Sequence, residues 1–130
     1  MEDRRLVKGT FKKCDMHVHS SSCYSRHYDE DSFFAAVLSS DLDVLAVTDH
    51  NSVDADLLSR LQHDMAQKDK TLFGGVEINV KLKETTIETY SLVLGNESKG
   101  DYFHAIVWFP MDQVEEMSDV VRQLFIASIL

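Results

Sequence analysis

Residues 42–50, "LDVLAVTDH", form a nearly continuous apolar run that ends in a threonine, an aspartate and a histidine. A run of this kind, without alternation of polar and apolar residues, is typical of a strand that is buried on both faces, as the strands of parallel sheets are. The segment therefore favours a parallel sheet with helices on its faces, which is the architecture of α/β proteins.

The neighbouring segments continue an alternating order of strands and helices. A strand at residues 11–18 and a helix at residues 29–40 are predicted before this segment. A helix at residues 51–68 and a strand at residues 71–80 are predicted after it. Ser52 is a plausible N-cap of the second helix. The pair Gly74–Gly75 in the third strand indicates either a bulge or a close approach of the backbone to a neighbour. The order βαβαβ predicts parallel strands joined by right-handed crossovers.

Two more strands and a helix are predicted in the last third of the chain. Residues 85–95 and 101–110 are rich in β-branched and aromatic residues, and Asp112 can cap a final helix. Because large side chains of a buried strand pack the wall of a sheet, the aromatic residues of the last strand are expected in the core. These residues are Tyr102, Phe103, Trp108 and Phe109.

Length and composition favour one globular domain over residues 1–130. The formal charge is −9, from 22 acidic and 13 basic residues, which opposes unaided binding to nucleic acid but leaves a small phosphorylated substrate compatible. The charged N-terminus lacks the apolar segment of a secretory signal, and no run reaches the roughly 18 apolar residues of a membrane span. A cytoplasmic protein without a membrane segment is therefore expected.

Potential metal ligands occur where the predicted strands end. His17 and His19 are two residues apart, so in a strand their rings share a face; a pair like this, taken alone, is more often exposed strand residues than a metal site. Asp49 and His50 end the next strand, and Glu77 and His104 lie in the later ones. Ligand groups collect at the carboxyl ends of parallel strands, so these residues predict a metal site for Zn, Mn or Fe. A carboxylate such as Glu77 can bridge two ions, which would suit a phosphoryl substrate and a shared hydroxide nucleophile.

Four segments carry a family resemblance. "DMHVHSS" (15–21), "LAVTDHNSV" (45–53), "GGVEINV" (74–80) and "YFHAIVWF" (102–109) resemble, in order, the first four motifs of the PHP (polymerase and histidinol phosphatase) superfamily. The resemblance covers residues 11–110, and "GTFKKCDMHVHSS" (9–21) is also similar to the opening of PHP domains that are fused to ATPase modules.

The resemblance implies a distorted (β/α)7 barrel with a trinuclear metal centre, here truncated to about its first half and incomplete at the C-terminus. It implies two or three divalent ions: one on His17 and His19, a second on His104 that Glu77 bridges to the first, and a third on His50 and His27. Asp15 and Asp49 would orient ligand imidazoles, and Glu77, His50 and Asp49 would be the catalytic residues. The later histidine and the aspartate-x-histidine pair of the family do not occur before Leu130.

The function expected from the resemblance is that of a metal-dependent phosphoesterase, or of the N-terminal part of one, which hydrolyses a phosphate mono- or diester with a metal-activated hydroxide. The expected substrate is a small phosphate ester or a nucleotide. The alternative is a non-catalytic metal-binding or interaction module, whose open barrel edge would be covered by a second copy or by a partner chain.

Three further residues are possible ligands or substrate contacts, each with a simpler interpretation. Cys23 could offer a thiolate to zinc, although a spare thiol is the more common case. Arg26 could contact a phosphate, although most loop arginines are simply solvated. His63 lies among polar residues and is expected to face solvent.

Overall fold

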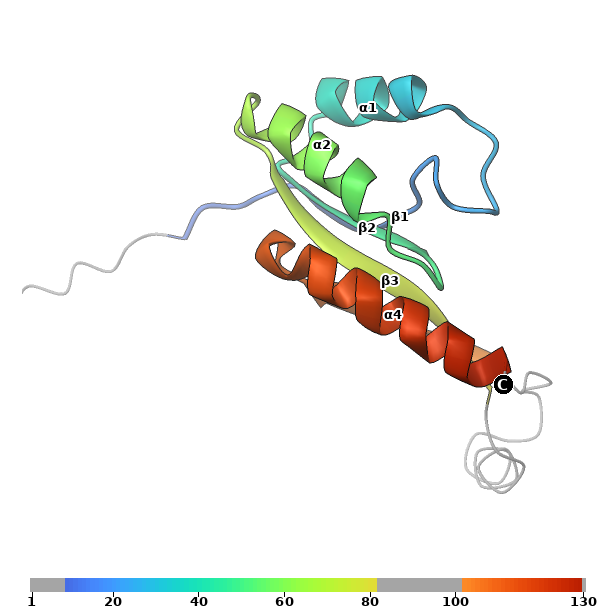
Figure 1. Cartoon of the computed structure of the whole chain (residues 1–130). Helices are drawn as coiled ribbons and strands as arrows, with labels where there is room; N and C mark the ends of the chain where they lie inside the picture. Colours follow the sequence, from blue (N-terminus) through green and yellow to red (C-terminus); the bar gives the residue numbers. More distant parts are fainter. Residues whose placement is uncertain (1–8, 82–101, 130) are drawn as a thin grey trace, which may run out of the picture.

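The computed structural model describes residues 9–81 and 102–129. Strands and helices alternate over the first part, and two further elements and a short 3-10 turn follow (Figure 1). In chain order they are β1 (Cys14–Val18), α1 (Glu30–Ser39), β2 (Val44–His50), α2 (Ala55–Ala66), β3 (Thr71–Lys81), β4 (Tyr102–Phe109), η1 (Met111–Gln113) and α4 (Val114–Ile129). The predicted strand over residues 85–95 lies outside the described residues.

The four described strands form one curled, mixed sheet in the order β1-β2-β3-β4 (Figure 1). β1, β2 and β3 are mutually parallel, as the alternating order predicts, but β4 runs antiparallel to β3. The chain is therefore α/β with a mostly parallel sheet. The antiparallel direction of β4 places its first residues beside the carboxyl end of β3, where His104 pairs with Asn79.

The core lies between the sheet and its helices. β2 is buried at every position from Leu45 to Asp49, which confirms that it is covered on both faces. Alternate β2 residues, Leu45 and Val47, pack in one apolar cluster with side chains from α1, α2 and α4. The main helical contributors are Phe33, Val37, Leu57, Leu58, Leu61, Met65 and Val114, and Phe109 of β4 joins them.

Gly74 and Gly75 mark a close approach rather than a bulge, because the pairing of β2 with β3 runs through both without a register shift. A Cβ atom on Gly74 would lie 2.2 Å from Cε2 of Phe109. A Cβ atom on Gly75 would lie 2.8 Å from Cγ2 of Thr48 and 2.9 Å from the carbonyl oxygen of Val107. The two glycines therefore leave room for β4 to pack directly on β3.

Two helix starts differ from the sequence prediction. Asp54, not Ser52, caps α2, because its carboxylate accepts a hydrogen bond from the backbone N–H of Leu57 at 3.0 Å. Asp112 lies inside the turn η1 and gives no N-cap, since the residue that precedes the turn is Pro110. Asp29 caps α1, because its carboxylate accepts a hydrogen bond from the backbone N–H of Ser32.

The prediction that the aromatic residues of β4 are all in the core was wrong for two of them. Phe109 is buried, but Phe103 is 46% exposed and Trp108 is 51% exposed. β4 is an edge of the described sheet, and Trp108, opposite Gly75, faces away from the helix layer. Its indole N–H donates a hydrogen bond of 2.8 Å to the carbonyl oxygen of Met16. Trp108 therefore links β4 to β1, the other edge of the curled sheet.

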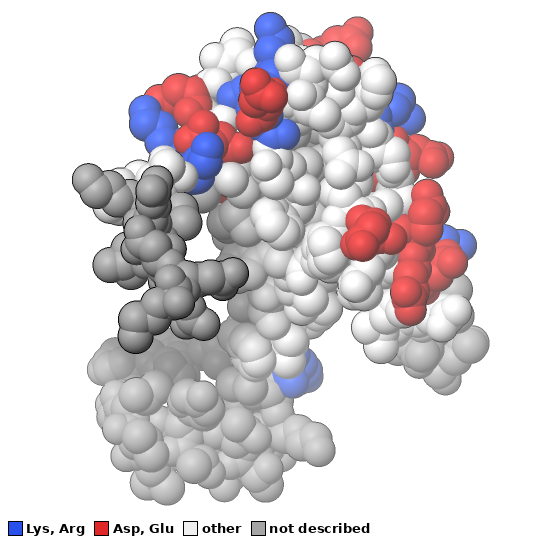
Figure 2. All heavy atoms as spheres, turned by 90° about the vertical axis from the view of Figure 1, so that its left-hand side faces the viewer, with Lys and Arg blue, Asp and Glu red and all other residues white. Residues whose placement is uncertain are grey.

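Charged residues of both signs are interspersed on the face shown in Figure 2, around a largely uncharged area. This face presents no continuous basic surface of the kind that binds nucleic acid. Within residues 9–81 and 102–129, no helix has both the length and the hydropathy needed to cross a membrane.

Candidate metal centre

Four strands bring five potential ligands to one edge of the sheet. His17 and His19 lie at and just after the end of β1, and His50 ends β2 directly opposite Glu77 of β3. His104 lies near the start of β4, which reaches the same edge because that strand is antiparallel. The clustering of ligands that the strand ends predicted is therefore present in the fold.

Glu77 lies at the centre of this cluster, with its side chain 4% exposed. One carboxylate oxygen, Oε2, lies 2.8 Å from Nε2 of His17 and 3.0 Å from Nε2 of His19. The other oxygen, Oε1, contacts Nδ1 of His104. The two oxygens therefore face different histidines, which is the arrangement that a carboxylate bridging two ions requires.

The spacing of the ligand atoms fits a small divalent ion. Nε2 of His17 and Nε2 of His19 lie 3.3 Å apart, and their distances to Glu77 are slightly shorter. With metal–ligand bonds of about 2.0–2.1 Å, neighbouring corners of a tetrahedron lie about 3.3 Å apart. Three groups in the described chain bring their ligand atoms within 4.8 Å of one another: His17–His19–Glu77, His50–Glu77–His104 and His19–Cys23–His50.

His50 supplies an independent sign that an ion fits here. Its Nδ1 is buried and has no hydrogen-bond partner, and it lies 3.7 Å from Oε2 of Glu77, beyond hydrogen-bond range. Its ring packs against those of His19 and His104, with centroids 4.5 and 5.8 Å away. A buried polar atom without a partner is costly, and coordination of an ion would satisfy it.

The electrostatic environment of the cluster favours the protonation states in which Glu77 and His19 can bind a metal. Burial alone raises the pKa of Glu77, but hydrogen bonds from His17 and His104 and the charge of His50 outweigh it and lower the pKa to about 2. Burial, followed by the neighbouring His50, lowers the pKa of His19. The carboxylate is therefore ionised and His19 tends to be neutral, the two states in which these groups can bind a metal.

Asp15 and Asp49 were expected to orient imidazoles, and the structure shows them holding backbone segments. Both carboxylate oxygens of Asp49 accept hydrogen bonds from Ser20, from its backbone N–H at 2.6 Å and its hydroxyl at 2.5 Å. Burial raises the pKa of Asp49, against the effect of these bonds. Asp15 accepts a bond from the backbone N–H of His17 at 3.1 Å. Asp49 thereby fixes the residue that follows His19.

The first loop contributes Cys23 to the cluster. Cys23 is 1% exposed, and its Sγ lies 3.3 Å from Nδ1 of His19. His27, the loop histidine expected to bind the third ion, is exposed and belongs to none of the three ligand groups in the described chain. Arg26 is likewise exposed. The available signal for Cys23 was its position four residues after His19, but periodicity does not specify how a loop folds back.

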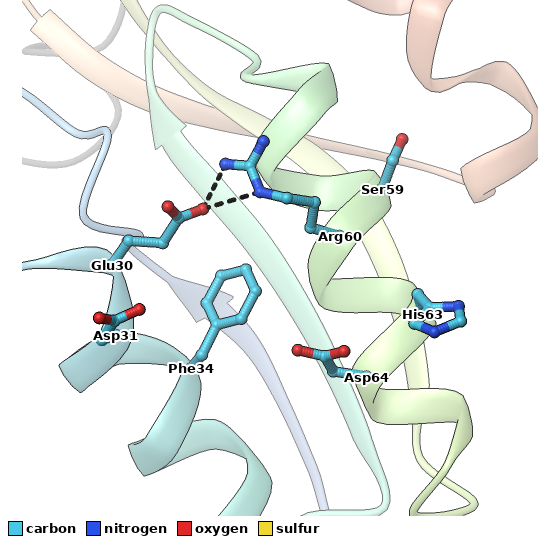
Figure 3. Close-up of a pocket in the computed structure, with 7 residues that line it drawn as sticks. All are labelled: Glu30, Asp31, Phe34, Ser59, Arg60, His63 and Asp64. Carbon is cyan, nitrogen blue, oxygen red and sulfur yellow. Dashed lines mark hydrogen bonds and ion pairs between the residues drawn. The ribbon is translucent and has the colours of Figure 1, made fainter.

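A groove of about 620 Å³ lies elsewhere, between α1 and α2 (Figure 3). Arg60 of α2 pairs there with Glu30 of α1 at the side of Phe34. His63 lines this groove, is exposed, and belongs to none of the ligand groups in the described ranges. This agrees with the expectation that it faces solvent.

The fold and cluster define an α/β protein with a potential metal-binding centre at one edge of its sheet. A scan against protein-family models and a search of curated proteins both find nothing that matches the chain.

Proposed function

We propose that the chain is a metal-dependent phosphoesterase of PHP type, or the N-terminal part of one. The observation that supports this most is the position of Glu77, whose Oε2 lies beside His17 and His19 while its Oε1 contacts His104. Two-metal centres are one established way to hydrolyse phosphate esters.

The residues present fit two ions around Glu77. His17 and His19 would hold one, and His50 and His104 would hold the other, with Glu77 shared between them. Nitrogen and carboxylate donors suit Zn, Mn or Fe. When bound, such ions polarise a phosphoryl oxygen and activate water for attack on phosphorus.

The histidines divide into buried and accessible ones. Glu77 and His19 are buried, which keeps the ligand geometry rigid, while the side chains of His17 and His104 are 47% and 51% exposed. The centre is therefore open to solvent on the side of these two rings, where a phosphate ester can approach.

The substrate class follows from phosphate chemistry and charge. The net charge of −9 disfavours the backbone of a long nucleic acid, so a small phosphate monoester or diester, or a nucleotide, is the substrate proposed. Ions in the centre would offset the local negative charge of Glu77 and attract a phosphate.

Hydrolysis of a chromogenic substrate tests the proposal. The wild-type chain is assayed with p-nitrophenyl phosphate and bis-p-nitrophenyl phosphate after addition of Zn²⁺, Mn²⁺ or Fe²⁺. Glu77→Gln should abolish turnover while the fold is retained, and Glu116→Gln, at an exposed position of α4, serves as the matched control. Absence of turnover with every metal and both esters would count against an enzyme.

A second candidate function is a non-catalytic metal-binding or interaction module. It is favoured by the exposed apolar side chains of Phe103 and Val107, which lie on the same face of β4, because an exposed apolar patch often marks an interface. Light scattering after size exclusion separates the candidates. A monomer with activity supports the enzyme, whereas an inactive oligomer that dissociates in Phe103→Ser supports the module.

A further inference from the structure

Both ring nitrogens of His19 have a partner. Nε2 faces Oε2 of Glu77 at 3.0 Å, and Nδ1 faces Sγ of Cys23 at 3.3 Å. The thiol itself has a second neighbour, because Sγ also lies 3.2 Å from the hydroxyl oxygen of Ser25. His19 and Cys23 are both buried, so solvent has little access to replace either partner.

The partner at each nitrogen decides where a neutral His19 carries its proton, since a neutral imidazole has one N–H and one lone pair. Without a metal, the ionised Glu77 can only accept, so Nε2 carries the proton. Nδ1 then accepts a hydrogen bond from the S–H of Cys23. In this state the thiol is a donor to His19.

Metal binding reverses this arrangement. An ion on the side of His17 and Glu77 needs the lone pair of Nε2, so the proton must reside on Nδ1. Nδ1–H then donates to Sγ, and the S–H of Cys23 has to turn toward the hydroxyl of Ser25. A thiol can perform both roles because its sulfur accepts while its S–H donates.

We propose that Cys23 is a positioning residue that, together with Ser25, holds either tautomer of His19 and so allows its Nε2 to bind a metal. This inference rests on the metal binding proposed above. Cys23 remains a protonated thiol in both states and does not itself coordinate the ion. The geometry favours this role, because Sγ lies beside Nδ1, on the opposite side of the ring from the nitrogen that faces Glu77.

The first test compares zinc affinities of variants that keep or lose the two hydrogen-bonding roles. Cys14→Ser serves as the background, since Cys14 is exposed and its removal leaves Cys23 as the one thiol of the chain. In that background, Cys23→Ser should keep the affinity for Zn²⁺, because a hydroxyl also donates and accepts. Cys23→Ala should weaken it by about 10- to 100-fold, the usual effect of losing a partner of a ligand histidine.

The second test observes the thiol directly, which a merely structural role would not affect. The S–H stretching vibration of the Cys14→Ser protein is recorded by Raman spectroscopy without and with Zn²⁺. The band should move to higher frequency with zinc, because S–H then donates to a hydroxyl instead of a stronger imidazole acceptor. Ser25→Ala should reduce zinc affinity and change the zinc-bound band position.

The outcomes separate this inference from the proposed function. A band that disappears with zinc would show direct coordination by a thiolate, and a band that does not move would show no coupling; either result overturns the role of Cys23. Equal zinc affinity of Cys23→Ala and its background would do the same while leaving the metal centre intact. If the wild-type chain binds no zinc, both proposals fail. If Cys23→Ala does not fold, the Raman bands and Ser25→Ala still decide.

Discussion

Replacement of Glu77 by glutamine should destabilise the chain without metal, and should destabilise it further when metal is present. A pKa lowered from 4.5 to about 2 means that the site prefers the ionised carboxylate over a neutral group. At about 1.4 kcal/mol for each pKa unit, this preference is worth roughly 3 kcal/mol. His17 and His104 are about half exposed, so solvent screening reduces it. We expect metal-free Glu77→Gln to lose about 2 kcal/mol of unfolding free energy.

With zinc the difference should grow. At a free zinc concentration of about 100 times Kd, the wild-type chain gains about 2.7 kcal/mol of stability by mass action. Glu77 contributes to two of the three ligand groups, so its replacement should lower the affinity about 100-fold or more, beyond the usual effect of a residue that only orients a ligand. At the same zinc concentration the gain of Glu77→Gln then falls to about 0.4 kcal/mol or less.

The assay is urea unfolding followed by circular dichroism, with a chelator in one series and zinc in the other. Glu116→Gln, the exposed control on α4, should match the wild type in both series. A Glu77→Gln chain that is as stable as wild type without metal, and that gains as much from zinc, would refute the reasoning.

Three further predictions concern the fold and its supports. Gly74→Ala should lower the free energy of unfolding by about 1–3 kcal/mol, because the added Cβ would lie 2.2 Å from the buried ring of Phe109. Gly9→Ala should have no effect in the same thermal unfolding assay, because no atom lies within 4 Å of its added Cβ. Equal melting temperatures of the two variants would contradict this. Metal-free protein should lose stability as the pH falls through about 6.5, because of His19, and again from about 4.5 toward 2, because of Glu77. The pKa of each group is lowered in the folded state, so the unfolded state binds protons first. A stability that rises as the pH falls, measured with a chelator present, would contradict this prediction. Asp49→Asn should cost about 1–3 kcal/mol in urea unfolding and weaken zinc binding, because an amide cannot accept from both donors of Ser20; unchanged values would show that these bonds do not matter.

The parallel part of the fold was predictable because one strand has the continuous apolar pattern of a strand in a parallel sheet. The apolar run ending at His50 indicated a strand buried on both faces, and β2 is buried in this way. Since the ends of such strands meet at one edge, the clustering of His17, His19 and Glu77 could also be predicted from position alone.

The remaining features depend on contacts between distant segments. Neither the direction of β4 nor the exposure of Phe103 and Trp108 follows from the residues of that strand, because both are set by how β4 pairs with β3. The choice between Ser52 and Asp54 as a cap depends on where the chain turns into α2. Cys23 reaches His19 because the loop folds back through a hydrogen bond from its backbone N–H to the carbonyl of Ser20, which periodicity does not encode.

The central claim is that the histidines and Glu77 form a metal centre, and metal content tests it most directly. Elemental analysis of the purified chain gives the identity and the equivalents of bound metal, beside a variant in which His17 and His19 are both changed to alanine. We expect two or more equivalents of zinc, manganese or iron in the wild type and a clear loss in the variant. A folded wild-type chain that holds almost no metal, even after incubation with these ions, would contradict it.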